Sequence, residues 1–193
     1  MFNWLAFLTY ALVTAITPGP NNIMSLSNAG RLGIKKSFPF NLGIGVGFCV
    51  VMSLCTIFAS LLEGLIPMIK TPMLIAGAFY LLFLAWQTLR HSGEIHEKQG
   101  ESSFFSGFVL QFVNPKIYIY ALVSMEAYIL PYYAGRALPL FGFAMLLAFI
   151  GFACTLLWAA FGQVFKLLFS RYAKLTNTIM ALLLVVCAVM LFL

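Results

Sequence analysis

The stretch TPGPNN at residues 17–22 interrupts an otherwise apolar run near the start of the chain. Proline has no backbone N–H group, so Pro18 and Pro20 deprive the carbonyls of Thr14 and Ile16 of their usual helical donors. If the run lies in lipid, these carbonyls need partners from the protein or from a water-filled cavity. We therefore predict a helix that breaks at this stretch.

The residues after the break suit the start of a second helix. Pro20 fits the first helical position, with Gly19 as its N-cap. The backbone N–H groups of Asn21, Asn22 and Ile23 are then expected to be free at the positive end of this half-helix. Such an end favours negative charge.

A second break follows in the stretch QFVNPK at residues 111–116. Asn114 is a favoured N-cap and Pro115 a favoured first helical residue, and Pro115 also frees the carbonyl of Gln111. Lys116 lies near the middle of an apolar run, where a lysine costs roughly 2.5–3.5 kcal/mol on insertion into a bilayer. We therefore expect its side chain to face the protein interior or a water-filled cavity.

The composition excludes an ordinary soluble enzyme. Of the 193 residues, 63% are hydrophobic and only 8% are charged, whereas soluble domains carry about 25% charged residues. Six apolar runs are each about as long as a helical membrane span, and they lack the alternation of barrel strands. We predict an all-α integral membrane protein with six transmembrane helices, of which helices 1 and 4 are interrupted. The runs cover residues 4–27, 37–62, 71–89, 104–127, 138–161 and 176–193.

The basic residues predict the orientation in the membrane. The net charge is +6, and the chain has no aspartate. Eight basic residues lie in the first, third and fifth connections and two in the others, so the positive-inside rule places the odd-numbered connections in the cytoplasm. Both termini are then expected outside. This distribution accounts for the positive charge without a nucleic-acid partner, and we predict none.

The two halves of the chain are similar under an offset of 97 residues, which places Pro18 on Pro115. Three spans in each half make the halves cross the membrane in opposite senses, which is the 3+3 inverted-topology repeat of many secondary transporters. We therefore predict a single membrane transporter domain over residues 1–193. It comprises a first repeat at 1–90, a polar cytoplasmic linker at 91–103 that holds His91 and His96, and a second repeat at 104–193.

Broken spans at corresponding positions of two halves predict a binding site at the bilayer midplane. Two helix N-termini and one ammonium group suit a carboxylate, while freed carbonyls and polar side chains suit an ammonium group. A zwitterionic amino acid matches this mixture, so we predict a small-molecule substrate and no cofactor, metal or catalytic residue. Tyr118 and Tyr120 are further candidates to line the pocket. The candidate substrate-binding residues are Thr17, Pro18, Gly19, Pro20, Asn21, Asn22, Gln111, Asn114, Pro115 and Lys116.

Other features predict packing. Gly43 and Gly47 form a pair of small residues that lets helices approach closely. Trp86, near the end of the third run, predicts an interfacial anchor. The cysteines lie in apolar runs without CxxC spacing, which argues against a disulfide framework or a zinc site; they are Cys49, Cys55, Cys154 and Cys187.

The motifs TPGPNN at 17–22, GAFYL at 77–81 and VNPK at 113–116 resemble those of the LysE/RhtB family of bacterial amino-acid exporters, over essentially the whole chain. The stretches LVTAITPGPNNI, LQFVNPKI and ALLLVVCAV look most like the cysteine/O-acetylserine exporter branch. The resemblance implies a bacterial inner-membrane protein that exports a small amino acid, driven by the proton gradient or the membrane potential. We expect it to work by alternating access.

Alternatives stay open at this point. The substrate of the exporter can be threonine-, homoserine- or lysine-like. From other classes, an intramembrane thiol redox protein requires paired cysteines or histidines within spans, and a membrane assembly protein requires no transport at all. Whether the chain forms a homo-oligomer is also open.

Overall fold

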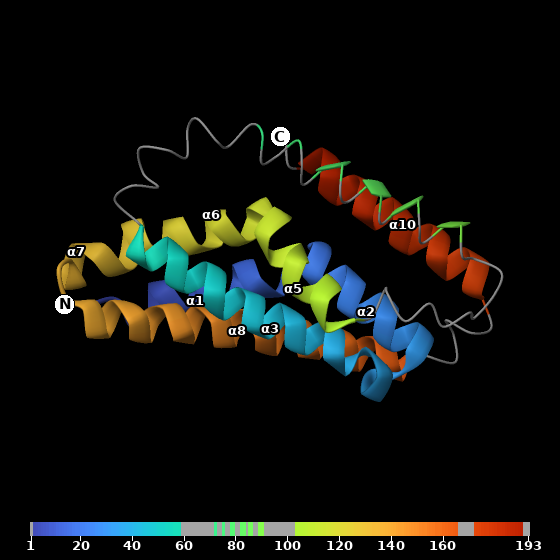
Figure 1. Ribbon diagram of the computed structural model, residues 1–193, viewed down its shortest axis with the longest axis horizontal. Coiled ribbons are helices and arrows are strands. Elements are labelled where there is room, and N and C mark those ends of the chain that lie inside the picture. The colour runs from blue at the N-terminus through green and yellow to red at the C-terminus, as the bar shows by residue number, and fades with distance from the viewer. Residues whose placement is uncertain are drawn as a thin grey trace.

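The computed structural model describes residues 2–58, 103–165 and 172–190, together with ten separate positions between 72 and 90. Every element in these ranges is a helix (Figure 1). Most of the predicted third span and nearly all of the predicted linker at 91–103, with His91 and His96, lie outside the described residues. The same holds for Gly77, Tyr80 and Leu81 of the GAFYL motif.

The first predicted span is broken, as the sequence indicates. Helix α1 (Trp4–Ile16) ends before the break, and α2 (Pro20–Leu32) begins with Pro20 at its first position and Gly19 as N-cap. Helix α2 runs past the predicted end at residue 27. It ends at Gly33, whose φ of 87° lies in the left-handed region that favours glycine.

Helix α3 (Ile34–Ile57) follows Gly33 directly, three residues before its predicted start. The Ile34 N–H donates to Oε1 of Gln163 at 2.8 Å, so a side chain from the end of α8 (Ala137–Val164) satisfies one of the orphan donors at the start of α3. The connection between the first two spans therefore lies beside the end of α8.

The fourth predicted span is also broken. Helix α5 (Phe104–Val113) ends at Asn114, and α6 (Pro115–Val123) begins with Pro115 at its first position. The axis bends by 62° between these two parts. The helical stretch continues beyond the predicted end at residue 127, through the π-helix η1 (Ser124–Ile129) and α7 (Leu130–Tyr133).

The two breaks can be compared at the start of the helix that follows each of them, α2 after the first break and α6 after the second. Gly19 and Asn114 are the N-caps, and Pro20 and Pro115 are the first helical residues, an offset of 95 residues. Pro18, which the offset of 97 placed on Pro115, lies outside both helices. The two helix starts thus lie 95 residues apart, and the repeat with its offset of 97 stays a prediction.

The lengths and composition of the helices fit a membrane protein. Helices α3 and α8 are each long and apolar enough to cross a bilayer, and the bent pair Phe104–Val113 and Pro115–Tyr133 adds a third candidate span. Helix α1 and the apolar part of α10 (Ala173–Met190) are shorter. In the described ranges, two or three of the six predicted spans therefore meet these criteria.

Glycines bring the helices into close contact. A Cβ atom on Gly43 of α3 would strike the Phe104 carbonyl oxygen of α5, and one on Gly107 of α5 would strike the Phe40 carbonyl oxygen of α3. A Cβ on Gly47 would meet the Gln111 side chain. The prediction that Gly43 and Gly47 permit a close helix approach is confirmed.

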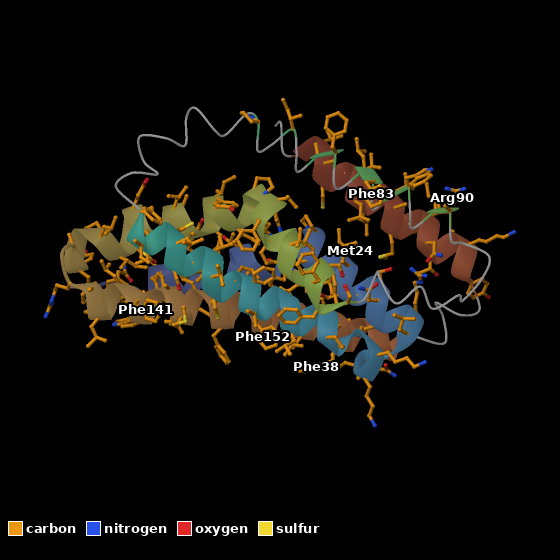
Figure 2. The ribbon with its side chains drawn as sticks, viewed as in Figure 1. Met24, Phe38, Phe83, Arg90, Phe141 and Phe152 are labelled. Carbon is orange, nitrogen blue, oxygen red and sulfur yellow. The ribbon has the colours of Figure 1, made fainter. Side chains whose placement is uncertain are left out.

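The helices form one elongated bundle in which α3 packs against α5 and α8, and α8 packs against α2 (Figure 1). Helix α10 contacts α2, and Met24 lies on the side of α2 nearest to it (Figure 2). Phe38 and Phe141 lie at the edge of the bundle and are 45% and 49% exposed (Figure 2). Large apolar side chains on such a surface suit lipid as the surrounding solvent.

Candidate functional site

A cavity lies where the two breaks meet. It holds about 360 Å³ of empty space, counting the part that is open to the surface. Its walls come from the end of α1, the start of α2, the middle of α3, the start of α6 and the middle of α8. The lining residues are Thr14, Ala15, Gly19, Pro20, Asn21, Asn22, Phe48, Asn114, Lys116, Ile117, Tyr120, Gly151 and Thr155.

Lys116 links the two breaks through its ammonium group. Its Nζ donates to the carbonyl oxygen and to Oγ1 of Thr17, both at 2.9 Å, and reaches the Pro18 carbonyl oxygen at 3.5 Å. A Cβ on Gly19 would lie 3.1 Å from both Cδ and Nζ of Lys116. The lysine therefore lies along the backbone of the first break, where the absence of a Gly19 side chain leaves room for it.

The charge of Lys116 meets no carboxylate in the part of the chain that the structure describes. Glu126 is the one acidic residue within these ranges, and it lies exposed in η1. Among the described residues, its hydrogen-bond partners are backbone carbonyls and one hydroxyl group. Lys116 also lines the adjoining cavity, so its side-chain nitrogen lies within reach of a group bound there.

Three side-chain amides tie the broken spans together behind Lys116. Asn21 Nδ2 donates to Gln111 Oε1 at 2.8 Å, and Gln111 Nε2 donates to the Gly107 carbonyl oxygen at 2.8 Å and to Asn21 Oδ1 at 3.3 Å. Asn114 Nδ2 also donates to Asn21 Oδ1 at 3.3 Å. All three side chains are at least nine-tenths buried, so these mutual bonds spare buried polar atoms the cost of desolvation.

The carbonyls freed by the first break are already bonded within the protein. Thr17 Oγ1 donates to the Thr14 carbonyl oxygen at 2.8 Å, and the Trp158 indole N–H donates to the Ile16 carbonyl oxygen at 3.0 Å. Asn22 Nδ2 donates to the carbonyl oxygens of Ala15 and Thr17, each at 2.9 Å. Each of these carbonyls therefore already has a donor within the protein, and their contact with a substrate ammonium stays a prediction.

The amide expected to be free at Ile23 is bonded as well. Its N–H donates to the Gly19 carbonyl oxygen at 2.9 Å, which is the first hydrogen bond of α2. Gly19 has no side chain to cap the helix, so the amides of Asn21 and Asn22 receive no acceptor from their N-cap. At the positive end of α2, the backbone amides without an N-cap acceptor are therefore those of Asn21 and Asn22, and the amide of Ile23 is not among them.

Six of the ten candidate residues line the cavity: Gly19, Pro20, Asn21, Asn22, Asn114 and Lys116. The other four adjoin it. Thr17 and Pro18 accept from Lys116, Gln111 bonds Asn21 from behind, and Pro115 starts α6. Of the two tyrosines, Tyr120 lines the cavity and Tyr118 donates to the Phe112 carbonyl oxygen instead.

The cavity wall contributed by α3 and α8 was not predicted. Phe48, Gly151 and Thr155 lie in apolar runs that carry no local sign of a site. Trp158 satisfies the broken backbone from the same helix α8. The sequence offered one indication of this wall. Trp158 and Thr155 each place a polar side-chain atom in a long apolar run, and such atoms need hydrogen-bond partners in lipid.

An apolar helical bundle with a cavity between two broken helices is typical of membrane proteins of the transporter class. The sequence matches the family described as LysE type translocator over residues 12–193, and the chain belongs to this family. It is 39% identical over 189 residues to the cysteine/O-acetylserine efflux proteins of Escherichia coli strain K12, Escherichia coli O9:H4 and Shigella sonnei. These alignments cover 97% of this chain and 96% of each relative. No solved structure matches the chain.

Proposed function

We propose that this chain exports cysteine, O-acetylserine or a similar small amino acid from the cytoplasm across the bacterial inner membrane. The single observation that carries the proposal is the cavity between the breaks, in which Lys116 meets no carboxylate of the described residues. The similarity to cysteine/O-acetylserine efflux proteins supports the choice of substrate.

The substrate carboxylate is proposed to bind near Lys116 and the N-terminus of α2. Both carry positive charge into the same cavity, and charge-assisted hydrogen bonds are the strong ones in a site of low dielectric. The substrate side chain then lies toward Phe48, Ile117 and Gly151, which form an apolar wall suited to a short side chain.

The proposed architecture has six spans in a single transporter domain, arranged as a 3+3 inverted repeat with both termini outside. In support, α3 of the first half packs against α5 of the second, and α8 of the second half packs against α2 of the first. The basic connection between α2 and α3 lies beside the end of α8, at the end of the bundle opposite the N-terminus (Figure 1). Alternating access is proposed as rocking of the halves around the cavity.

Counterflow in proteoliposomes tests the proposal. Vesicles loaded with unlabelled substrate are expected to accumulate labelled cysteine or O-acetylserine when they contain the protein. Labelled threonine, homoserine and lysine, measured in parallel, rank the alternative substrates. Absence of counterflow for the whole panel contradicts the proposed function. Undiminished counterflow after replacement of all four cysteines by alanine separates a carrier from a thiol redox protein.

A further inference from the structure

We infer that the oxygens of the first break form the binding site for the substrate's amino group, and that Lys116 occupies this site as a tethered cation until a substrate displaces it. The inference rests on the proposed function, since it takes the substrate to be an amino acid.

The oxygens around Lys116 Nζ have the composition of an ammonium site. Two backbone carbonyls and one hydroxyl, from Thr17 and Pro18, surround a nitrogen that carries three N–H donors. A primary ammonium of a substrate presents the same three donors on a similarly compact charge. We define these three oxygens as the ammonium cradle.

The remaining acceptors of the break do not offer an equal site. The carbonyls of Thr14 and Ile16 accept from Thr17 Oγ1 and from Trp158. Asn22 donates to the Ala15 carbonyl and also to the Thr17 carbonyl of the cradle, which accepts from Lys116 as well. The donors other than Lys116 hold no net charge. Of the residues that the structure describes, Lys116 is the one charged donor on the break. Its side chain ends four bonds from its Cβ, so it can leave without unfolding a helix.

The geometry around Gly19 favours such a movement. The Cδ and Nζ atoms of Lys116 lie 3.1 Å from the place where a Gly19 Cβ would be, so the stem of the lysine crosses bare backbone. Gly19 and Lys116 both line the cavity, so the displaced ammonium can enter it without leaving the site. There it meets the substrate carboxylate.

The exchange selects zwitterions. A simple amine that enters the cradle displaces the Lys116 ammonium and offers it no new partner, which is unfavourable in a site of low dielectric. A simple carboxylate offers no ammonium that could replace Lys116 in the cradle, so Lys116 stays in place. An α-amino acid supplies one ammonium for the cradle and one carboxylate for Lys116. The cradle then holds an ammonium in both the empty and the loaded site, and the Lys116 charge gains a carboxylate partner in the loaded one.

Thermal unfolding of the purified full chain in detergent tests the cradle with methylammonium chloride as the probe. Tetramethylammonium chloride at equal concentration is the control, because it carries the same charge but no N–H donor. For the wild type, the two salts are expected to give the same Tm. For Lys116→Met, methylammonium is expected to give a saturable rise of about 2–4 °C over the control.

The double variant Lys116→Met/Thr17→Val locates the effect, because it removes the hydroxyl of the cradle and keeps its carbonyls. It is expected to lose at least half of the methylammonium shift. Equal shifts from the two salts in Lys116→Met, or an undiminished shift in the double variant, overturn the inference.

Gly19→Ala provides a second route if Lys116→Met does not fold. Its Cβ crowds Lys116 and leaves the oxygens of the cradle in place, so a smaller methylammonium shift is expected to emerge, and its absence counts against the cradle. None of these measurements uses an amino-acid substrate. Absence of counterflow by the wild type contradicts the proposed function and leaves the cradle untouched. Absence of the methylammonium shift contradicts the cradle and leaves the proposed function untouched.

Discussion

The side-chain nitrogen of Lys116 lies 2.9 Å from both the carbonyl and the hydroxyl oxygen of Thr17, although 99 residues separate the two in the sequence. This contact joins the first turn of α6 to the end of α1, so a donor from the second break meets acceptors from the first. The first break supplies the oxygens of Thr17 and Pro18, and the second supplies a charged donor that has no acidic partner among the described residues. Lipid tails offer no hydrogen-bond donor or acceptor, so contact between the two breaks lowers the cost of holding the broken backbone and the Lys116 side chain in the membrane.

Lys116→Met and Asn21→Leu are each expected to reduce counterflow of labelled amino acid to less than a tenth of the wild-type rate. The first removes the charge that faces the cavity, and the second removes an amide that bonds Gln111 and Asn114. Lys174→Met on the exposed start of α10 is the matched control and is expected to transport normally. Normal counterflow by both site variants, in correctly folded protein, contradicts the assigned site.

Asn21 and Gln111 are expected to show strong energetic coupling. Gln111→Leu alone leaves the buried Asn21 amide without its nearest partner, at a cost of about 1–3 kcal/mol. In the double variant Asn21→Leu/Gln111→Leu both amides of the pair are gone, so the loss of stability is expected to be smaller than the sum of the two single losses. A double-mutant cycle of unfolding free energies measures this difference, and strict additivity rules out the coupling.

The breaks were predictable because proline removes a backbone hydrogen bond from the helical turn in which it lies, which is a local effect. The N-cap and first helical residue assigned from the sequence, Gly19 with Pro20 and Asn114 with Pro115, are those of the structure. The interior position of Lys116 followed in the same way from the cost of a charge in lipid. The helix starts at the two breaks lie 95 residues apart, whereas the predicted offset of 97 pairs Pro18 with Pro115.

The partners of the broken backbone were not predictable, because they depend on tertiary contacts. Trp158 lies 142 residues from Ile16, and no local pattern connects them. The π-helix at Ser124–Ile129 also escaped prediction. Its last turn is closed by the Leu130 N–H donating to the Met125 carbonyl, just before Pro131. Proline there signals a disturbed turn but does not specify whether the helix ends, bends or widens.

Gly43→Ala is expected to destabilise the protein by about 1–3 kcal/mol, because its Cβ would strike the Phe104 carbonyl oxygen of α5. Gly142→Ala on α8 is the matched control, since a Cβ there meets nothing within 4 Å. The control is expected to be neutral or slightly stabilising, because alanine is the better helix former by about 1 kcal/mol. Thermal unfolding of the two variants compares them, and equal Tm values contradict the close approach of α3 and α5.

Trp158→Phe is expected to lower stability by about 0.5–1.5 kcal/mol and to slow counterflow, because the Ile16 carbonyl then loses its donor at the edge of the break. Phenylalanine keeps an aromatic ring at the position, so the change isolates the indole N–H. Trp86→Phe is the control, since its ring is exposed and lies under the Arg90 guanidinium, 5.1 Å from the ring centroid. An equal effect of the two substitutions on transport argues against a role of the Trp158 N–H at the break.

Gly151→Ala is expected to narrow the cavity and change the preference between substrates. A Cβ on Gly151 would lie 2.7 Å from Cζ of Phe48, and both residues line the cavity, so the ring must shift into the empty space. O-acetylserine carries a longer side chain than cysteine, and its counterflow is expected to fall several-fold relative to that of cysteine. Phe48→Leu in the same background shortens the displaced side chain and is expected to restore O-acetylserine transport. An unchanged ratio of the two rates in Gly151→Ala places the substrate side chain elsewhere in the cavity.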